Sequence, residues 1–233
     1  RWTSEFDKKE ETEFWYVIND RHLELSDYSV NTRSKIRRGL KNLVVKKITK
    51  IEVLDKGYDV YASSFSRYKS FSKPLNRADF LTFIRNLDGD REFWGIYLKG
   101  TNTLVAYSQN KIFDNCCDYD EIRFNPIYLK QYSSYALFYT MNQYYLNERK
   151  LQYVNDGSRS IAHNTNIQQF LIEKFKFRKA YCNLHIVYSV GLSISIKILY
   201  IFRRLIGSVK INIFQKFSVL LNQEQIKRSF EKR

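Results

Sequence analysis

The sequence is poor in the residues that make covalent cross-links, tight turns and linkers. It has three cysteines, two prolines and eight glycines in 233 residues. Two of the cysteines, Cys116 and Cys117, are neighbours that rarely bridge each other, so the chain has no disulfide framework. We therefore expect a cytoplasmic protein in a reducing compartment. The small numbers of Pro and Gly exclude a collagen-like or linker-rich chain.

Motifs for several common chemistries are also missing from the sequence. It has no Gly-x-Ser-x-Gly, P-loop or His-Glu-x-x-His motif, and no Cys-x-x-Cys or Cys/His metal-binding spacing. Cys182 and His185 are three residues apart and would face opposite sides of a strand, so they do not form a nucleophile–base pair. The first thirteen residues are charged and lack the apolar core of a signal peptide. We expect no metal site and no signal peptide.

The abundant residues are aromatic and basic. Eighteen Tyr and seventeen Phe, within a hydrophobic fraction of 44%, are ample for a core. The formal net charge of +15 predicts attraction to nucleic acid, to acidic lipid head groups or to a phosphorylated cofactor. Basic proteins without such a partner are also common, so charge alone does not decide.

Residues 118–188 carry the pattern that organises the chain. Residues 118–124 alternate charged and apolar side chains and end at Asn125-Pro126, which predicts a strand and a turn. Helical spacing over 132–141 predicts a nearly surrounded helix. A strand at 151–154, a helix over 167–175 and a closing strand at 181–188 follow. Two helices that connect three strands make an α/β unit, in which ligands bind at the carboxyl ends of strands.

The preceding residues predict antiparallel strands and helices. Strands are expected at 14–18, 43–48, 93–98 and 104–108, the last two joined as a hairpin at Gly100, with helices over 58–68 and 77–87. Residues 29–50 hold eight Lys or Arg and no acid. This basic segment is either a solvated helix face or a clamp for a polyanionic substrate or cofactor.

The composition changes after Tyr188. From Ser189 onward nine Lys or Arg accompany two Glu, and apolar residues share one helical face: Ile194, Ile198, Ile201 and Leu205. Two interpretations are open, an amphipathic segment lying on an anionic membrane and a helical pair packed on the domain. The apolar run at 186–202 is shorter than the ~20 residues of a spanning helix, which disfavours a transmembrane segment.

The order of elements and three local patterns over residues 44–188 resemble the GNAT acyltransferase fold, in particular its Fem-like branch of aminoacyl and N-acyl transferases. Phe124-Asn125-Pro126 with Leu137 matches the strand end and helix start where that family binds the acyl-CoA pyrophosphate. Residues 166–177 resemble the family's late helix, and 181–188 its closing strand. The resemblance implies an α/β (α+β) fold with a mixed, mostly antiparallel sheet flanked by helices. We expect three regions, an N-terminal strand and basic helix (1–43), this domain (44–188) and a basic C-terminal helical tail (189–233).

The resemblance also implies which residues meet the donor. Tyr132, Ser133, Ser134 and Tyr135 fall in the family's phosphate loop, and Asn166 is a further candidate in the late helix. The family's loop normally supplies two glycines so that a phosphate can approach the backbone, but Tyr132 and Ser134 stand there in this chain. Lys176 likewise replaces the glycine of the family's Gly-Phe ending. The Fem-like branch often lacks the loop and uses aminoacyl-tRNA, so the donor is open among acyl-CoA, acyl carrier protein and aminoacyl-tRNA.

Acyl transfer to an amine needs a base for the ammonium proton, donors for the oxyanion and an acid for the leaving group. Glu121 and Arg123 are two apart on the predicted strand, so they share one face near its carboxyl end. We expect Glu121 to be the base and Arg123 to bind an acidic acceptor or a donor phosphate. A surface ion pair is the alternative interpretation.

The polar turn after the next strand adds substrate-binding candidates. Asn155, Asp156 and Arg159 are placed to line a pocket, with Asp156 on the acceptor amine and Arg159 on an anionic group. A tight turn capped by Asp156 is the alternative. His163 is a candidate for substrate binding or for a local hydrogen bond, and Tyr181 is a candidate acid for the leaving group.

The leading hypothesis is an acyltransferase that works in the cytoplasm, at the inner face of the membrane. It would move an acyl or aminoacyl group from an activated donor to an amino group on a small or lipid-linked cell-envelope precursor. A non-enzymatic RNA-binding module is one alternative, suggested by the charge and the interleaved aromatic residues. An inactive acyltransferase-like membrane scaffold is another, suggested by the missing glycines.

Overall fold

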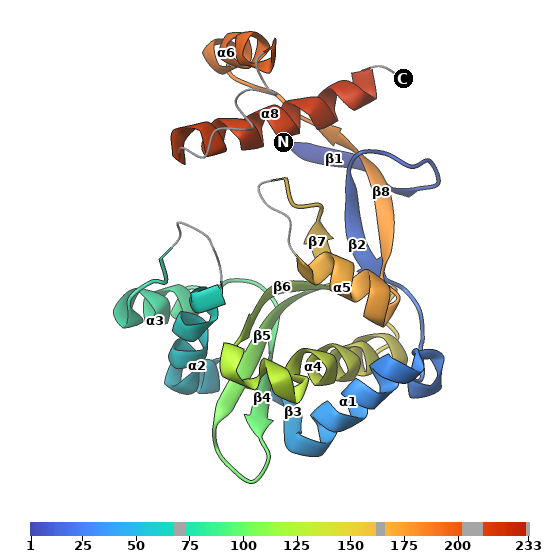
Figure 1. Cartoon of the computed structure of the whole chain (residues 1–233), viewed down its shortest axis with the longest axis vertical. Helices are drawn as coiled ribbons and strands as arrows, with labels where there is room; N and C mark the ends of the chain where they lie inside the picture. The colour runs from blue at the N-terminus through green and yellow to red at the C-terminus, as the bar shows by residue number, and fades with distance from the viewer. Residues whose placement is uncertain (68–72, 162–165, 202–211, 232–233) are drawn as a thin grey trace. The chain divides into compact units, whose positions relative to one another are not determined.

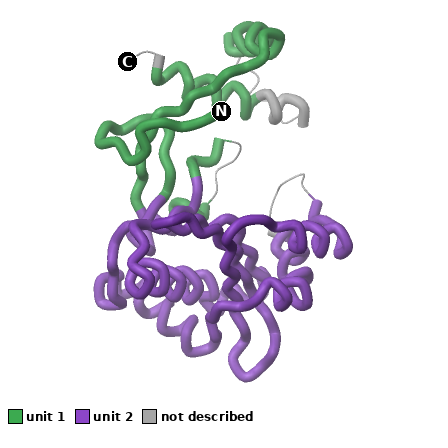
Figure 2. The backbone as a smooth tube through the Cα atoms, turned by 180° about the vertical axis from the view of Figure 1, so that it is seen from behind, with its two compact units in different colours: residues 1–17, 158–169, 178–233 green, residues 18–157, 170–177 purple. Residues whose placement is uncertain are grey.

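The computed structural model describes residues 1–67, 73–161, 166–201 and 212–231. The backbone divides into two compact units, which Figure 2 colours separately. Unit 1 comprises residues 1–17, 158–169 and 178–233, and unit 2 comprises residues 18–157 and 170–177. Each unit is therefore assembled from segments that are separate in the sequence.

The described strands of unit 2 lie in the order β7-β6-β5-β4-β3. Their bounds are Tyr153–Ser158 for β7, Cys116–Phe124 for β6, Leu104–Phe113 for β5, Arg91–Leu98 for β4 and Leu43–Ile48 for β3. Strands β3 to β6 pair antiparallel, and β6 pairs parallel with β7. The predicted β4–β5 hairpin is confirmed, and Gly100 in its turn has a φ of 77° that favours glycine.

Helices α2 (Lys50–Ser64) and α3 (Arg77–Arg85) pack together on one face of this sheet (Figure 1). The face is apolar, and its buried cluster includes Val53, Val60, Phe80, Ile84, Phe93, Tyr97 and Tyr107. Helix α2 begins before the predicted residue 58 because Thr49 and Glu52 form a capping box at its start. A short 3-10 helix, η2 (Phe65–Arg67), follows it.

Helices α1 (Val30–Asn42) and α4 (Ser133–Asn142) pack against each other on the other face. After α4 comes a π-helix, η4 (Gln143–Glu148), whose Tyr145 contacts Trp94 of β4. Trp94 and its neighbour Phe93 alternate between the two faces, as successive strand residues do. A Cβ atom on Gly39 would lie 2.8 Å from the backbone oxygen of Tyr132, so this glycine permits the close packing of α1 on α4. Most of α4 is buried, which confirms the prediction of a nearly surrounded helix.

Unit 1 holds strands in the order β1-β8-β2. Their bounds are Trp2–Lys8, Arg178–His185 and Trp15–Asn19, and the last two residues of β2 belong to unit 2. Helix α8 (Asn212–Glu231) packs on β8, where Ile226 joins Phe14, Cys182, Leu184 and Ile186 in a buried cluster. Helix α6 (Val190–Ile201) packs on α8. No described helix has both the length and the apolar character needed to cross a membrane.

The predicted elements of the organising pattern are confirmed, with shifted ends. The late helix is α5 (Asn166–Phe175), and the closing strand β8 runs from Arg178 to His185 rather than over 181–188. Strand β1 was not predicted, because most of its side chains are exposed and Glu5 and Asp7 have left-handed φ values of 52° and 62°. The fold is thus a mixed, mostly antiparallel sheet flanked by helices, as predicted, while the division into regions at residues 43 and 188 stays a prediction.

Candidate active site

The parallel strands β6 and β7 pair with each other only at their starts. Their register joins Cys116, Cys117 and Asp118 to Tyr153, Val154 and Asn155, and no further β6–β7 pair follows among the described residues. Residues 119–124 of β6 continue alongside β5. The strands therefore part toward their carboxyl ends, which is where α/β sheets bind ligands.

Asn155 marks the point where the strands part. Its side-chain Nδ2 donates to Asp118 Oδ1 at 2.9 Å, and its Oδ1 accepts from the backbone N–H of Gly157 at 2.9 Å. Asn155 is buried, and burial raises the pKa of Asp118. Gly157 has a φ of 91°, which a side chain would strain. The predicted substrate-binding residue Asn155 thus holds the turn that ends β7 rather than standing free.

Asp156 is the chemically unusual carboxyl group of this turn. Burial raises its pKa from 3.8 to about 7, and burial is the one cause of this shift among the residues that the structure describes. Burial mainly raises the pKa of Tyr119, and the charge of Asp156 adds a smaller contribution in the same direction. A carboxyl group with a pKa near neutrality can both accept and release a proton, which is the property of a general base.

A β-bulge separates the faces on which Tyr119 and Glu121 lie. Asn110 pairs with Tyr119 and Gln109 with Glu121, so Asp120 is an extra residue in β6. Tyr119 donates to Asn142 Oδ1 of α4 at 2.7 Å. Glu121 instead lies beyond the bulge, on the face of α2. A sequence pattern with strict alternation could not show this change of face.

The predicted pair Glu121 and Arg123 is a half-buried ion pair. Arg123 Nε lies 2.6 Å from Glu121 Oε1, and the exposed fractions of the side chains are 21% and 17%. The guanidinium group of Arg123 also lies over the rings of Tyr61 and Phe65, at 5.2 and 4.9 Å from their centroids. These contacts fit the ion-pair interpretation, and neither role predicted for the two residues is tested.

The start of α4 differs from the other helix starts of unit 2. A short 3-10 helix, η3 (Pro126–Gln131), leads into it, and Tyr132 adopts a left-handed φ of 61° at the N-cap without a side-chain cap. Helices α1, α2 and α3 are capped by Ser29, Thr49 and Asn76. Ser133 is buried, and its Oγ has no hydrogen-bond partner within the described residues. The first N–H groups of α4 can therefore meet an anion from outside the helix.

Helix α1 brings two cations to this start. Lys35 Nζ donates to Tyr135 Oη at 3.5 Å and lies 5.3 Å from the ring centroid. Arg38 donates to Tyr132 Oη at 3.5 Å, with its guanidinium carbon 6.0 Å from that ring. Of the predicted donor-binding residues, Tyr132, Ser133, Ser134 and Tyr135 are therefore gathered at one helix start. Lys35 and Arg38 were missed as individual residues, although the eight cations of residues 29–50 pointed to this helix.

A buried polar network lies under α4 and η4. Tyr145 Oη accepts from Trp94 Nε1 at 2.9 Å and from Asn110 Nδ2 at 3.2 Å, and donates to Glu92 Oε2 at 2.9 Å. Burial raises the pKa of Tyr145, which keeps the hydroxyl protonated. π-Helical turns occur often at functional sites, and this one places Tyr145 in the network.

The remaining predicted residues lie in unit 1 or outside the described ranges. Arg159 and Tyr181 both contact Trp15, whose ring centroid is 4.5 Å from the Arg159 guanidinium carbon and 6.2 Å from the Tyr181 ring centroid. Lys179 Nζ lies 4.1 Å from the same centroid. Burial and then the charge of Glu11 raise the pKa of Tyr181. Asn166 is exposed at the start of α5, and His163 lies outside the described residues.

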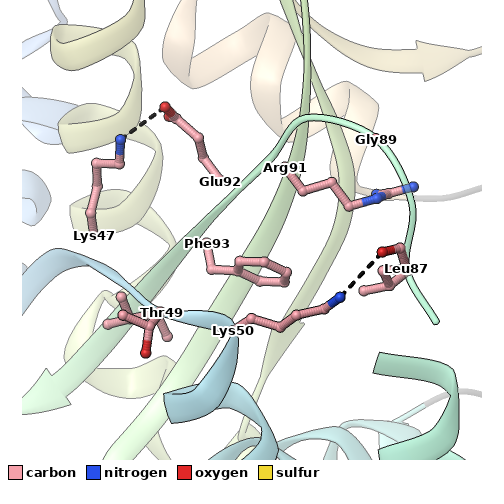
Figure 3. A pocket seen from close by; sticks show the side chains of 9 residues that line it. Lys47, Thr49, Lys50, Leu87, Gly89, Arg91, Glu92 and Phe93 are labelled. Carbon is pink, nitrogen blue, oxygen red and sulfur yellow. Dashed lines mark hydrogen bonds and ion pairs between the residues drawn. The ribbon is translucent and has the colours of Figure 1, made fainter. Parts of the chain in front are cut away.

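A cavity of about 330 Å³ lies elsewhere in unit 2, at the other end of the strands (Figure 3). Three cations, Lys47, Lys50 and Arg91, line it together with Glu92. Each is engaged by the protein: Lys47 Nζ lies 2.8 Å from Glu92 Oε1, Lys50 donates to the backbone oxygen of Leu87 at 3.2 Å, and Arg91 pairs with Asp120. The three cations are thus held by the protein, and Asp156 is not among the residues that line the cavity.

Comparison with known proteins supports the fold. No protein-family model matches the sequence, and a search of curated proteins also finds no match. Among solved structures, FemX is similar with a TM-score of 0.55 and 11% identity, over 71% of this chain and 59% of the FemX chain. L-PGS from Bacillus licheniformis has a TM-score of 0.47 and 16% identity, over 78% of this chain and 64% of that chain.

A third similar structure is the PaiA N-acetyltransferase from Thermoplasma acidophilum in complex with coenzyme A, with a TM-score of 0.35 and 17% identity over 47% of this chain and 74% of that chain. The fold assignment rests on FemX, and the present chain spans 59% of its length. At 11% identity the likeness shows the fold. The chain therefore has a GNAT-like fold in the arrangement found in FemX, which confirms the predicted resemblance.

Proposed function

We propose that this protein is an acyltransferase that moves an acyl or aminoacyl group from a phosphate-bearing donor to an amine. The observation that carries the proposal is Asp156, whose pKa of about 7 suits a general base at the carboxyl end of β7. The uncapped start of α4 follows β6, which runs parallel to β7, so both features belong to the same end of the sheet. The GNAT-like fold supports the reaction class.

The proposed step begins with an acceptor that carries an ammonium group. Asp156 takes one proton, and the free amine attacks the acyl carbonyl so that a C–N bond forms. The C–O bond of an ester donor, or the C–S bond of a thioester, then breaks. The leaving hydroxyl or thiol takes the second proton of the attacking nitrogen. Glu121 is the alternative base predicted from the sequence, but its Oε1 is already engaged by Arg123.

The donor's phosphates would lie at the start of α4, where Lys35 and Arg38 add positive charge to the first N–H groups of the helix. The rings of Tyr132 and Tyr135 border this helix start. The two glycines of the family's loop are replaced here by Tyr132 and Ser134. Among the three donors left open by the sequence, aminoacyl-tRNA fits best, because α1, which packs on α4, carries five Lys or Arg that can attract a polyanion. A cell-envelope amine as the acceptor follows from the Fem-like resemblance.

Donor binding tests this proposal. Calorimetric titration with aminoacyl-tRNA, acetyl-CoA and a long-chain acyl-CoA should give saturable binding for one of the three, and we expect it for aminoacyl-tRNA. The variant Lys35→Gln/Arg38→Gln should weaken that binding about tenfold or more, because two charge-assisted phosphate contacts are lost.

The matched control is Arg37→Gln/Lys41→Gln, which removes two exposed cations from the same helix. It should change the affinity less than about threefold once the salt concentration is fixed. Equal losses in both variants would mean diffuse attraction rather than a site. Equal affinity for charged and uncharged tRNA, with no acyl transfer, would favour the RNA-binding module, and no binding of any donor would contradict the proposal.

A further inference from the structure

Helix α6 exposes a stripe of aliphatic side chains. Val190, Ile194, Ile198 and Ile201 are spaced so that they share one face, and they are 80%, 56%, 56% and 75% exposed. Ile196, on the other side of the helix, is 2% exposed. The inner face packs on α8, where the Arg228 guanidinium carbon lies 3.9 Å from the ring centroid of Tyr200. One face of α6 is thus packed and the other is open, and the membrane interpretation of the tail stays a prediction.

Positive charge flanks this α6 stripe. Lys197 is exposed on the same helix, directly before Ile198. In the sequence, Arg203 and Arg204 follow Ile201 closely, and residues 189–233 contain nine Lys or Arg and two Glu. An apolar stripe with cations beside it matches the boundary between the acyl chains and the phosphate groups of an anionic lipid layer.

The length of α6 fits a helix that lies on a bilayer and does not cross it. Its twelve residues extend roughly 18 Å at 1.5 Å per residue, whereas the hydrocarbon core is about 30 Å thick. Because Ile196 on the opposite side of the helix is buried, the face with the exposed aliphatic side chains would enter the lipid.

A second copy of the chain is a poorer partner for this surface. Each copy has a net charge of +15, and the stripe is bordered by cations, so an interface between two such faces would bring like charges together. An anionic lipid surface supplies the opposite charge and an apolar layer at the same place.

We propose that the α6 stripe docks this protein on anionic membranes as a peripheral, non-spanning contact. Aliphatic side chains enter the interface, and Lys197 meets lipid phosphates. The contact is independent of the transferase reaction, so a failed donor-binding experiment would leave it standing and the reverse also holds.

Vesicle co-sedimentation tests the proposal. The full chain should bind vesicles of phosphatidylcholine that contain about 30% phosphatidylglycerol. Its affinity for vesicles of phosphatidylcholine alone should be at least about tenfold lower. The variant Ile194→Ser/Ile198→Ser should reduce binding to the anionic vesicles at least about tenfold, and Lys197→Glu should reduce it by a smaller factor of about three.

The matched control is Val30→Ser/Ile51→Ser in unit 2, because these residues are 73% and 74% exposed and do not belong to the stripe. It should bind anionic vesicles as the unchanged chain does. Circular dichroism and elution volume establish that each variant is folded. Equal binding to both vesicle types, or unchanged binding of the stripe variant, would overturn the proposal. A dimer that the stripe variant dissociates would identify a second copy as the partner instead.

Discussion

The two faces of the unit 2 sheet share the same strands but differ in what lies beneath their helices and in how the helix starts are capped. On the α2 face, aromatic and aliphatic side chains form a closed cluster, the helix start is capped by its own side chains, and Glu121 is paired with Arg123. On the α4 face, the helix start has no side-chain cap, and a polar network around Tyr145 lies beneath the helix. Tyr119 donates a hydrogen bond to Asn142 of α4 on this second face, and Asp156 lies toward the carboxyl end of β7.

Under the proposed function, the α2 face mainly supplies stability and the α4 face mainly supplies the chemistry. Capped and paired groups stabilise the folded state, but their hydrogen-bonding capacity and charge are already satisfied, so they bind a ligand poorly. Groups that stay uncapped or desolvated reduce stability, and they persist where a ligand or a reaction uses them. Changes on the α2 face should therefore mainly alter folding, and changes near Asp156 and α4 should mainly alter function.

The largest expected effect is that of Asp156→Asn on catalysis. Removal of the base should slow transfer by about 100- to 10,000-fold, because general-base catalysis contributes on that order. Donor affinity should change less than about twofold. Single-turnover kinetics at several concentrations of the donor identified by calorimetry give both the transfer rate and the donor affinity.

Glu121→Gln on the opposite face is the matched comparison for Asp156→Asn. It should leave the transfer rate within a few-fold of the unchanged protein, since Asp156 still takes the proton. If instead Glu121→Gln abolishes transfer and Asp156→Asn does not, the base is the residue predicted from the sequence and the two faces exchange roles.

The second effect concerns the pH dependence of stability. Because the pKa of Asp156 is about 7 in the folded state and 3.8 ordinarily, the folded protein binds more protons than the unfolded chain between these values. Its stability contribution is fully present below about pH 4 and is lost as the pH rises toward 7. Asp156→Asn should therefore be more stable than the unchanged protein by about 2–4 kcal/mol at pH 8 and similar at pH 4. Urea denaturation across this range gives the difference, and a pH-independent gap would contradict the burial of Asp156.

A third test alters the packing of α1 on α4. Gly39→Ala would gain about 1 kcal/mol of helix propensity, but its Cβ would lie 2.8 Å from the Tyr132 backbone oxygen and 3.1 Å from Ala136 Cβ. The clash should dominate, with a net loss of about 1–3 kcal/mol in unfolding free energy and weaker donor binding as Lys35 and Arg38 move away. Gly191→Ala in α6 has no atom within 4 Å of the new Cβ and should be neutral or slightly stabilising. Equal effects of the two substitutions in thermal denaturation would rule out the steric explanation.

The smallest effects compare two hydroxyl groups at helix starts. Thr49→Ala removes a cap from α2 and should cost about 1 kcal/mol without changing donor affinity. Ser133→Ala removes a buried Oγ that has no partner within the described residues, so stability should stay level or rise by up to about 1 kcal/mol while donor affinity falls. Chemical denaturation measures the stability of each variant, and calorimetry on the same samples measures its donor affinity. A reversed pattern would mean that the start of α4 is a structural feature.

Local patterns carried most of the fold prediction. Strand β3 matches the predicted range 43–48. Its own residues, with apolar ends and a basic middle, are enough to predict a strand, and no knowledge of the strand it pairs with is needed. The bulge at Asp120 depends on pairing with Gln109 and Asn110, so the face of Glu121 could not be read from its own segment. Trp15 was missed as the partner of Arg159 and Tyr181 for the same reason, since its contacts are distant in the sequence. The pKa of Asp156 likewise arises from burial, which a turn motif does not reveal.

The pairing of β1 with β8 sets an order for folding during synthesis. Trp2 lies opposite His185, so β1 can pair only after the much later strand β8 has been synthesised. Residues 18–157, which make up most of unit 2, are complete in the meantime and can begin to fold. A waiting strand is an aggregation hazard, because its free edge can pair with other nascent chains. Glu5 and Asp7 place left-handed backbone and charged side chains on that edge, and such features disfavour pairing with other chains.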